Sequence, residues 1–473
     1  MRKSGILLPV FSLPSPHGIG TFGKAAFRFV DFLKAAGQRY WQILPLHPTG
    51  FGDSPYQCFS AFAGNPYFID LDILCDEGLL LPEEIEAAAL GFDTGRVDYG
   101  RQYARRLPLL RRAFSRFVPG AAFAAFCAKE DKWLSPYARF MALKAANDGA
   151  PWNAWKEKTA APDEVQFWQF LQYHFFAQWQ AVKDYANAAG IEIIGDMPMY
   201  VAYDSADVWE TPEQFLLDER GLPLLVAGCP PDAFSADGQL WGNPIYDWAY
   251  MARQTPAFSW WGKRMAHALR LYDVVRIDHF RGFASYYTVP FGEKTARRGK
   301  WCKGPGMTLF DSLRKRCGEL PIMAEDLGFL TPEVRALLKE TGFPGMKVLQ
   351  FAFDSREESD YLPHNYDRHC VVYTGTHDND TVLGWARTAA PADVAFAGRY
   401  LHMGDGDSLN WSMMRAAVAS VADTAILTMQ DILGLSSEGR INTPATDSGN
   451  WTWRMDARCL NGWLSGILRE MTA

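Results

Sequence analysis

The sequence lacks several features that identify particular classes of protein. None of its eight cysteines forms a C-x-x-C pair, and several lie in apolar runs, as buried free thiols do. No apolar run approaches the roughly 20 residues needed to span a bilayer. The opening MRKSGILLPVFSLP has proline and glycine where a secretion signal would have its apolar segment. We therefore expect a reduced, cytoplasmic protein without a membrane segment.

Motifs for metal, phosphate and serine-nucleophile chemistry are also missing. The chain has no H-E-x-x-H, EF-hand, Walker A or G-x-S-x-G sequence, and its nine histidines are scattered. The net charge is −7, from 47 basic and 54 acidic residues. Nucleic acids and anionic membranes both call for a basic face, so neither is an expected partner. These absences are compatible with a neutral substrate, and we expect no metal and no cofactor.

Eight short runs of β-branched or aromatic residues predict the architecture. Each is apolar on both faces and ends in a polar residue or proline, which indicates a buried parallel strand. The runs lie at residues 5–11, 39–47, 191–200, 273–280, 321–328, 346–354, 370–378 and 424–431.

Helical patterns separate these runs. Residues 23–37, 165–190 and 331–342 show helical spacing or helix start signals, and each segment ends at a glycine. Alternating strands and helices predict a parallel sheet of the α/β class. Eight such repeats suggest that the sheet closes into a (β/α)8 TIM barrel.

Two spacings between the predicted strands are too long for simple crossovers. Residues 48–190, between barrel strands 2 and 3, predict an inserted, mostly helical subdomain. Residues 198–255, between strands 3 and 4, predict a second insertion, also mostly helical, whose Gly- and Pro-rich part 221–248 forms a loop over the barrel mouth. Residues 1–473 thus form one barrel domain with insertions, since a barrel alone needs roughly 250 residues.

Carboxylates follow five of the predicted strands. The C-terminal ends of barrel strands converge on one face, where barrel enzymes place their active sites. A buried carboxylate is costly unless it is paired or hydrogen-bonded, so several on one rim are hard to explain by packing. The five are Asp196, Asp278, Glu325, Asp354 and Asp378, with Asp326 and Asp431 as near neighbours.

Each carboxylate also has a purely structural interpretation. Asp196 could cap a loop or a helix, and Arg276 could form a simple ion pair with Asp278. Asp326 could cap a helix with its neighbour as a bystander, and GTHDND could be turn chemistry. These alternatives are jointly weaker, because all the residues fall at strand ends.

Cleavage of a glycosidic bond needs two carboxyl groups that flank the anomeric carbon. Arg276 shares a strand face with Asp278, and its positive charge is expected to keep Asp278 ionised, as a nucleophile requires. Glu325 needs a raised pKa to act as an acid, which burial near other carboxylates would provide. A third carboxylate could grip sugar hydroxyls, and His279 and His377 are expected to donate to hydroxyls rather than bind metal. An aromatic content of 14% weakly favours a carbohydrate ligand.

At RIDHF, AEDLG and THDND the sequence resembles the α-amylase clan of retaining glycosidases. It is most similar to glycoside hydrolase family 77, the 4-α-glucanotransferases known as amylomaltase or disproportionating enzyme. Longer strings in the same order support the resemblance: DSPYQCFSAFAGNPYFID, GDMPMYVAYDSADVW, PPDAFSADGQLWGNPIYDW and MQDILGLSSEGRINTPATDSGNWTWR. The similarity runs from residue 5 to about 455, nearly the whole chain.

The resemblance implies transfer of an α-1,4-glucan segment to the 4-OH of glucose or another glucan by a retaining double displacement. The implied substrates are malto-oligosaccharides and starch- or glycogen-derived α-glucans, handled by a monomer or homodimer. Asp278 is implied as nucleophile, Glu325 as general acid/base and Asp378 as transition-state stabiliser. The implied substrate-binding residues are Ser54, Tyr56, Asp196, Asp232, Gln239, Trp241, Arg276, His279, Asp354, His377 and Asn450.

One segment departs from the family pattern, and two other functions stay open. In TPATDSG we expect a glycine near Ala445 and an apolar or small residue near Asp447, a difference that bears on acceptor contacts. An α-amylase-like hydrolase of α-1,4-glucans is the alternative within the same class. A non-catalytic glycan-binding barrel is the alternative from another class, and it would be expected to have lost one of the three acidic residues.

Overall fold

A computed structural model describes residues 2–50, 52–91, 93–231, 236–328, 330–446 and 448–473. Its eight parallel barrel strands pair in the order β10-β11-β12-β1-β2-β3-β6-β9. Each overlaps one of the eight predicted runs, so the predicted barrel is confirmed. The strands are β1 Lys3–Leu7, β2 Tyr40–Gln42, β3 Glu192–Met197, β6 Val274–Ile277, β9 Ile322–Ala324, β10 Gly345–Val348, β11 Cys370–Tyr373 and β12 Thr424–Thr428.

The sheet closes between β9 and β10. The Ala324 N–H donates to the Pro344 carbonyl at 3.0 Å, and the Met346 N–H donates to the Asp326 carboxylate at 2.6 Å. Asp326 is buried, and a Cβ at Gly345 would lie 2.6 Å from its Oδ2. A side chain at position 345 would therefore displace the carboxylate that joins the two strand ends.

Apolar side chains pack on both faces of the barrel strands. Leu7, Ile194, Val371 and Ile426 are among the buried residues that fill the barrel interior. A larger core lies between the strands and the helices, and it continues without a break into the insertion between β2 and β3. Burial on both faces is the physical reason that the strands read as continuous apolar runs.

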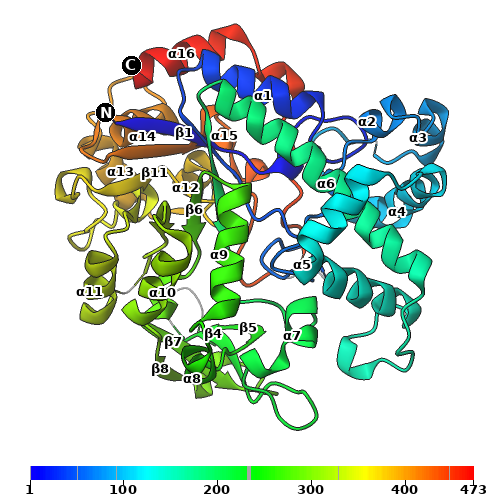
Figure 1. Ribbon diagram of the computed structural model, residues 1–473. Coiled ribbons are helices and arrows are strands. Elements are labelled where there is room, and N and C mark those ends of the chain that lie inside the picture. The colour runs from blue at the N-terminus through cyan, green and yellow to red at the C-terminus, as the bar shows by residue number, and fades with distance from the viewer. Residues whose placement is uncertain (1, 51, 92, 232–235, 329, 447) are drawn as a thin grey trace.

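Helices cover the outside of the barrel, and α1 and α16 lie side by side near the two termini (Figure 1). The helices predicted at 23–37 and 331–342 are α1 and α11, which end just before glycines with a positive φ of 70° and 68°. No helix among the described residues is long and apolar enough to cross a membrane. The covering helices are α1 Lys24–Ala35, α9 Ser259–Leu271, α10 Met307–Cys317, α11 Pro332–Thr341, α12 Val382–Thr388, α13 Pro391–Tyr400, α14 Leu409–Ala419, α15 Met429–Ile432 and α16 Gly462–Thr472.

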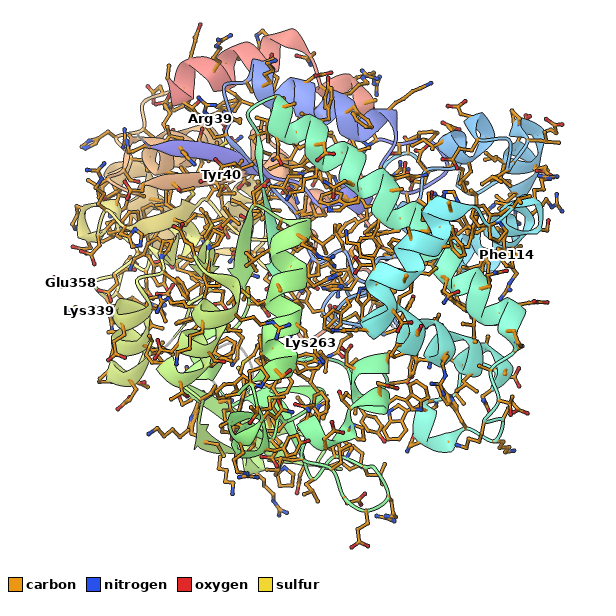
Figure 2. All side chains as sticks on the ribbon, in the orientation of Figure 1. Arg39, Tyr40, Phe114, Lys263, Lys339 and Glu358 are labelled. Carbon is orange, nitrogen blue, oxygen red and sulfur yellow. The ribbon has the colours of Figure 1, made fainter. Side chains whose placement is uncertain are left out.

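The first insertion is helical, as predicted. Phe114 of α4 lies within it (Figure 2), and its ring is 5.6 and 5.5 Å from those of Phe167 and Phe170 in α6. Because α6 also packs on α1 and β3, the insertion shares its core with the barrel. The subdomain bounds 48–190 stay a prediction. The helices are α2 Leu71–Asp76, α3 Pro82–Ala88, α4 Tyr99–Arg116, α5 Ala121–Ala146 and α6 Pro162–Ala188.

The second insertion is not mostly helical as predicted, because part of it forms β-strands. Besides α7 Ala206–Glu210 and α8 Trp248–Arg253, it holds two strands of a four-stranded antiparallel sheet in the order β5-β4-β7-β8. This sheet lies at the bottom of Figure 1. The other two strands follow β6, so residues about 60 positions apart pair here. The strands are β4 Leu225–Cys229, β5 Gln239–Pro244, β7 Ser285–Pro290 and β8 Lys300–Lys303.

Candidate active site at the barrel mouth

The C-terminal ends of four barrel strands bring acidic side chains to one mouth of the barrel. Asp196 lies near the end of β3, Asp278 directly follows β6, Glu325 directly follows β9, and Asp378 lies in the loop after β11. The Glu325 N–H donates to the Ile277 carbonyl at 3.0 Å, so neighbouring strands stay paired up to the acidic residues. The predicted convergence of these side chains therefore follows from the parallel register.

Arg276 is a buried cation in this mouth. Its Nη1 lies 2.8 and 2.7 Å from the two carboxylate oxygens of Asp196 and 3.2 Å from Oδ1 of Asp278. The Tyr56 hydroxyl donates to Asp196 at 2.7 Å. Asp196 is fully buried, whereas the Asp278 side chain is 29% exposed. The Arg276–Asp278 contact is present, but Asp196 takes the shorter bonds and Asp278 keeps access to solvent.

The pKa of Asp278 is set mainly by desolvation and by neighbouring charges. Although its side chain touches solvent, the surrounding protein desolvates it and raises its pKa well above the usual range. Arg276 lowers this pKa, as expected, but the charges of Asp196, Glu325 and Asp378 raise it further. Arg276 acts in the expected direction, but desolvation of Asp278 outweighs the effect of this single cation.

Glu325 is fixed by two backbone N–H groups. The His279 N–H donates to Oε2 at 2.7 Å, and the Leu327 N–H donates to Oε1 at 2.9 Å. Burial raises the pKa of Glu325, while Arg276 and these two N–H groups oppose the rise. Because the charge of Glu325 also raises the pKa of Asp278, the two carboxyls lose their protons in linked steps.

His279 has an unusual backbone conformation and a ring nitrogen without a hydrogen-bond partner in the described part of the chain. Its φ is 52°, in the left-handed region that few residues with a side chain adopt. The ring meets the Trp241 ring edge-on at 4.9 Å, and burial lowers the histidine pKa to about 3, which keeps the imidazole neutral. Its buried Nε2 has no hydrogen-bond partner among the described residues. That nitrogen remains available to a ligand in the mouth.

Asp378 is held by residues of the segment after β12. The Asn442 side chain donates to its Oδ1 at 2.6 Å, and His377 Nε2 lies 3.3 Å from the same oxygen. Arg440 donates to the Asp378 carbonyl at 3.0 Å. Neither Asn442 nor Arg440 was predicted from the sequence. The only signal was their place in the polar–aromatic stretch EGRINTPATDSGNWTWRM.

An aromatic stack joins two distant segments at the mouth. The Tyr56 ring stacks on the His377 ring at 5.2 Å, with an interplanar angle of 14°. Trp451 lies 5.8 Å from Tyr56 and 6.0 Å from His377, and it was not predicted to be a site residue. The stack therefore holds the hydroxyl of Tyr56 toward Asp196 and fixes the orientation of the imidazole beside Asp378.

The β5 strand places Trp241 beside His279 at the mouth. The Trp241 Nε1–H donates to Gln239 at 3.1 Å, and Gln57 donates to the Trp241 carbonyl at 3.1 Å. The Tyr200 ring lies 6.2 Å from the indole. Gln239 thus contacts Trp241 directly, and the loop is tied to the segment that carries Tyr56.

Ser54 and Asn450 make bonds within their own turns. The Ser54 hydroxyl accepts a hydrogen bond from the Tyr56 N–H at 3.3 Å. The Asn450 side chain accepts one from the Thr443 N–H at 2.9 Å. Asp232 lies outside the described residues. Among the described residues, no group of three or more His, Cys, Asp or Glu side chains could hold a metal ion.

Asp354 makes its contacts away from the other acidic residues. Its carboxylate pairs with Arg356 at 2.6 Å, which lowers its pKa to about 2. The predicted run 346–354 is longer than β10, which ends at Val348 and is followed by a 3-10 turn, Leu349–Phe351. Within the described part of the chain, the hydrogen bonds and the ion pair of the Asp354 carboxylate are all made with Arg356.

Comparison with known proteins agrees with this geometry. Residues 8–460 match the family model described as 4-alpha-glucanotransferase. The 4-alpha-glucanotransferase of Thermus thermophilus is 51% identical over 96% of this chain and 95% of its own length. That of Clostridium butyricum is 48% identical over 98% of each chain. The solved structure of amylomaltase from Streptococcus agalactiae in complex with acarbose has a TM-score of 0.97 and 40% identity, covering 100% of this chain and 99% of that one. This chain therefore belongs to the 4-alpha-glucanotransferase family.

Proposed function

We propose that this enzyme cleaves an α-1,4 bond in a glucan and transfers one fragment to the 4-OH of glucose or another glucan, with retention. The observation that carries the proposal is one barrel mouth in which Asp278 contacts Arg276 and is influenced electrostatically by Glu325 and Asp378. Family membership favours transfer over hydrolysis. The acarbose bound by the 40% identical amylomaltase supports an oligosaccharide ligand at this mouth.

In the first step the Asp278 carboxylate attacks C1 of the sugar while Glu325 protonates the glycosidic oxygen. The C1–O bond breaks, the shortened glucan leaves with a free 4-OH, and a β-glucosyl ester of Asp278 remains. In the second step an acceptor 4-OH gives its proton to Glu325 and attacks C1, which releases Asp278. Retention requires the two carboxyl groups to lie roughly 5–5.5 Å apart.

The chemistry needs the proton of the linked pair on Glu325 and the negative charge on Asp278. Both pKa values are raised, so the pair keeps a proton at a higher pH than isolated carboxyls would. The transition state favours this arrangement, because the positive charge that develops at C1 lies next to the Asp278 anion. Arg276 cannot lose its proton, and its bonds to Asp196 hold it in place to stabilise the Asp278 anion.

Asp378 and His279 are placed to bind hydroxyl groups of the reacting sugar. The contacts of Asp378 among the described side chains use Oδ1, which leaves Oδ2 to accept hydroxyl protons. His279 has an unpaired Nε2 and a neutral ring, so it can donate or accept without carrying charge. Hydrogen bonds from these two residues that shorten as the sugar ring flattens would stabilise the transition state more than the bound substrate.

Transfer requires that the ester intermediate meets a sugar before it meets water. The segment around Trp241 and the segment from 430 to 454 both reach the mouth, through the contacts of Trp241 with His279 and of Asn442 with Asp378. We propose that they hold the acceptor sugar and exclude water. The second insertion, 198–255, would then serve acceptor binding.

Incubation with maltotriose alone tests the proposal. Transfer predicts glucose together with a series of longer glucans, while the total number of reducing ends stays nearly constant. Proton NMR of the new linkages is expected to show α-anomers from the earliest time points. A steady rise in reducing ends would mean hydrolysis instead, and unchanged maltotriose would mean that the barrel only binds glucans.

A further inference from the structure

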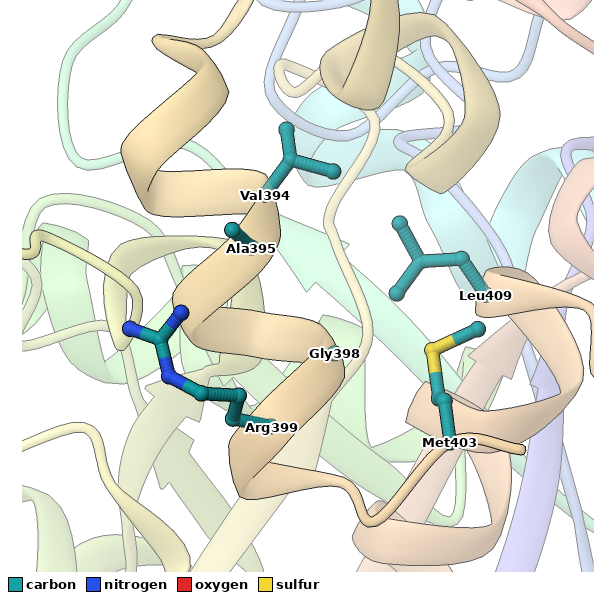
Figure 3. A pocket seen from close by; sticks show the side chains of 6 residues that line it. All are labelled: Val394, Ala395, Gly398, Arg399, Met403 and Leu409. Carbon is teal, nitrogen blue, oxygen red and sulfur yellow. The ribbon is translucent and has the colours of Figure 1, made fainter. Parts of the chain in front are cut away.

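Two hollows lie outside the barrel mouth. One, with a volume of about 400 Å³, lies between α13 and the start of α14 (Figure 3). Nothing in the structure shows what covers it, so it supports no assignment. Its lining is apolar apart from one arginine and consists of Val394, Ala395, Gly398, Arg399, Met403 and Leu409.

The second hollow has a different chemical character. Its volume is about 340 Å³, and it lies where α5 and the segment after it meet α7 and the loop that follows α7. Three indole rings and four polar side chains surround it, and we call it the tryptophan groove. Its lining residues are Arg139, Leu143, Trp152, Asn153, Trp155, Lys158, Trp209 and Arg220.

The indole rings of the groove are fixed by the protein. The Trp152 Nε1–H donates to the Tyr203 carbonyl at 2.9 Å, and the Trp155 Nε1–H donates to the Ala150 carbonyl at 2.8 Å. The rings of Trp155 and Trp209 lie 5.9 Å apart at 55°. Trp155 is buried, whereas Trp152 and Trp209 are partly exposed. Two indole N–H groups are already used, so these rings offer mainly their apolar faces to a ligand.

The rim of the groove consists of hydrogen-bond donors. Arg139, whose guanidinium lies 5.6 Å from the Trp209 ring, is joined on the rim by Lys158, Arg220 and the amide of Asn153. No carboxylate is among the described lining residues, although Arg220 pairs with the neighbouring Asp218 at 3.4 Å. Glucose rings present apolar C–H faces, and their hydroxyl and ring oxygens accept hydrogen bonds. A phosphate ion would suit the cations but would have no use for three tryptophans.

The groove is connected to the segment that carries Tyr56. The Ala206 N–H at the start of α7 donates to the Phe59 carbonyl at 2.8 Å. The Ala61 N–H donates to the Asp207 carboxylate of the same helix, also at 2.8 Å. A glucan bound in the groove would therefore be held close to the barrel mouth. This raises the effective concentration of the glucan at the mouth.

We propose that the tryptophan groove is a second binding site for a neutral α-glucan chain, separate from the barrel mouth. The volume is within the range of small ligand sites and suits a short stretch of glucose units. The inference rests on the proposed function and extends it, because it predicts that long glucans bind through two sites and short ones through one.

Native electrophoresis in gels with and without glycogen tests this inference. The parent is Glu325→Gln, which is not expected to turn over the polysaccharide, and the groove variant adds Trp152→Ala and Trp209→Ala. We expect the apparent Kd for glycogen to rise about tenfold or more, with equal mobility in gels without glycogen. The readout is binding, so it stands apart from the maltotriose products that test the proposed function.

Two further variants keep the test decisive. Arg139→Ala combined with Arg220→Ala changes only exposed rim residues, and we expect a several-fold higher Kd without loss of the fold. Arg399→Ala, in the hollow of Figure 3, is the matched control and is expected to leave glycogen binding unchanged. A neutral ligand also predicts that the difference persists at high salt. Equal glycogen binding by groove variants and parent, or a difference that disappears at high salt, would overturn the inference.

Discussion

Two groups of carboxylates surround the barrel strands, and they differ in what they bind. Asp326 and Asp431 are buried, and each accepts a backbone N–H bond from another element, at 2.6 and 2.7 Å. Asp278 and Asp378 instead have side chains that are 29% and 44% exposed at the barrel mouth. The first group uses its oxygens to hold the chain together, and the second keeps oxygens available for a ligand.

The contrast is sharpest at Glu325 and Asp326, which are adjacent in the sequence. Both accept backbone N–H bonds, but Glu325 is partly exposed at the mouth, whereas Asp326 is buried in the β9–β10 closure. Adjacent residues at a strand end point in opposite directions, so only one of the two can face the mouth. A position at a strand end is therefore not enough to identify a functional carboxylate.

The largest expected effect on activity distinguishes Glu325 from its neighbour Asp326. Glu325→Gln is expected to lower glucan transfer by about 10⁴-fold with little change in the thermal midpoint, because the amide can neither donate a proton as an acid nor accept one as a base. Asp326→Asn is expected to do the reverse, with a lower midpoint and most of the activity retained. Kinetics on maltotriose and thermal unfolding of both variants check this pair. If Asp326→Asn abolished transfer in a fully folded protein, the division into two groups would fail.

Asp431→Ala tests the structural group by itself. The substitution leaves the Thr374 hydroxyl and the Val382 N–H, now bonded at 2.6 and 2.7 Å, without their buried acceptor. We expect a loss of about 3 kcal/mol in the free energy of unfolding, measured by urea denaturation. Asp423→Ala is the matched control, since its partner Arg368 is on the surface, and it is expected to cost less than about 1 kcal/mol. Equal losses in the two variants would contradict the assignment.

Asp207 is another buried carboxyl group, and it makes the stability of the protein depend on pH. Burial raises its pKa from 3.8 to about 6, so the folded protein binds this proton more tightly than the unfolded chain does. Its contribution to stability is fully present below pH 3.8 and is lost as the pH rises through about 6, by about 3 kcal/mol in total. The thermal midpoint of Asp207→Asn relative to wild type, followed from pH 4 to 7, is expected to rise with pH. A constant difference would mean that Asp207 titrates normally.

The smallest expected effect concerns Ala445, where the sequence departs from the family pattern. Its φ of 62° is in the left-handed region, which explains why a glycine was expected there. Ala445→Gly is expected to raise the free energy of unfolding by up to about 1 kcal/mol. Ala145→Gly, in the exposed part of α5, is expected to lower it by about 0.5–1 kcal/mol. Shifts of the same sign in both variants would show that backbone strain at Ala445 is unimportant.

Much of the site could be predicted from local sequence, and the remainder depends on contacts between distant segments. Asp278 and Glu325 directly follow short apolar strands, and parallel pairing guarantees that they meet. Asn442 and Trp451 were missed because their roles come from packing on Asp378 and Tyr56, which are far away in the chain. The predicted run 346–354 extends beyond β10, which ends at Val348, because an apolar run does not show where its strand ends.

The barrel could be predicted from the amino-acid sequence, since side chains buried on both faces of a strand leave a continuous apolar run. The acidic residues at the strand ends could be predicted in the same way. The folded structure was needed to show which carboxylates face the mouth, which of them join strands, and that β4, β5, β7 and β8 form an antiparallel sheet. These outcomes depend on side-chain direction and on partners tens of residues away, and neither is encoded in a local pattern.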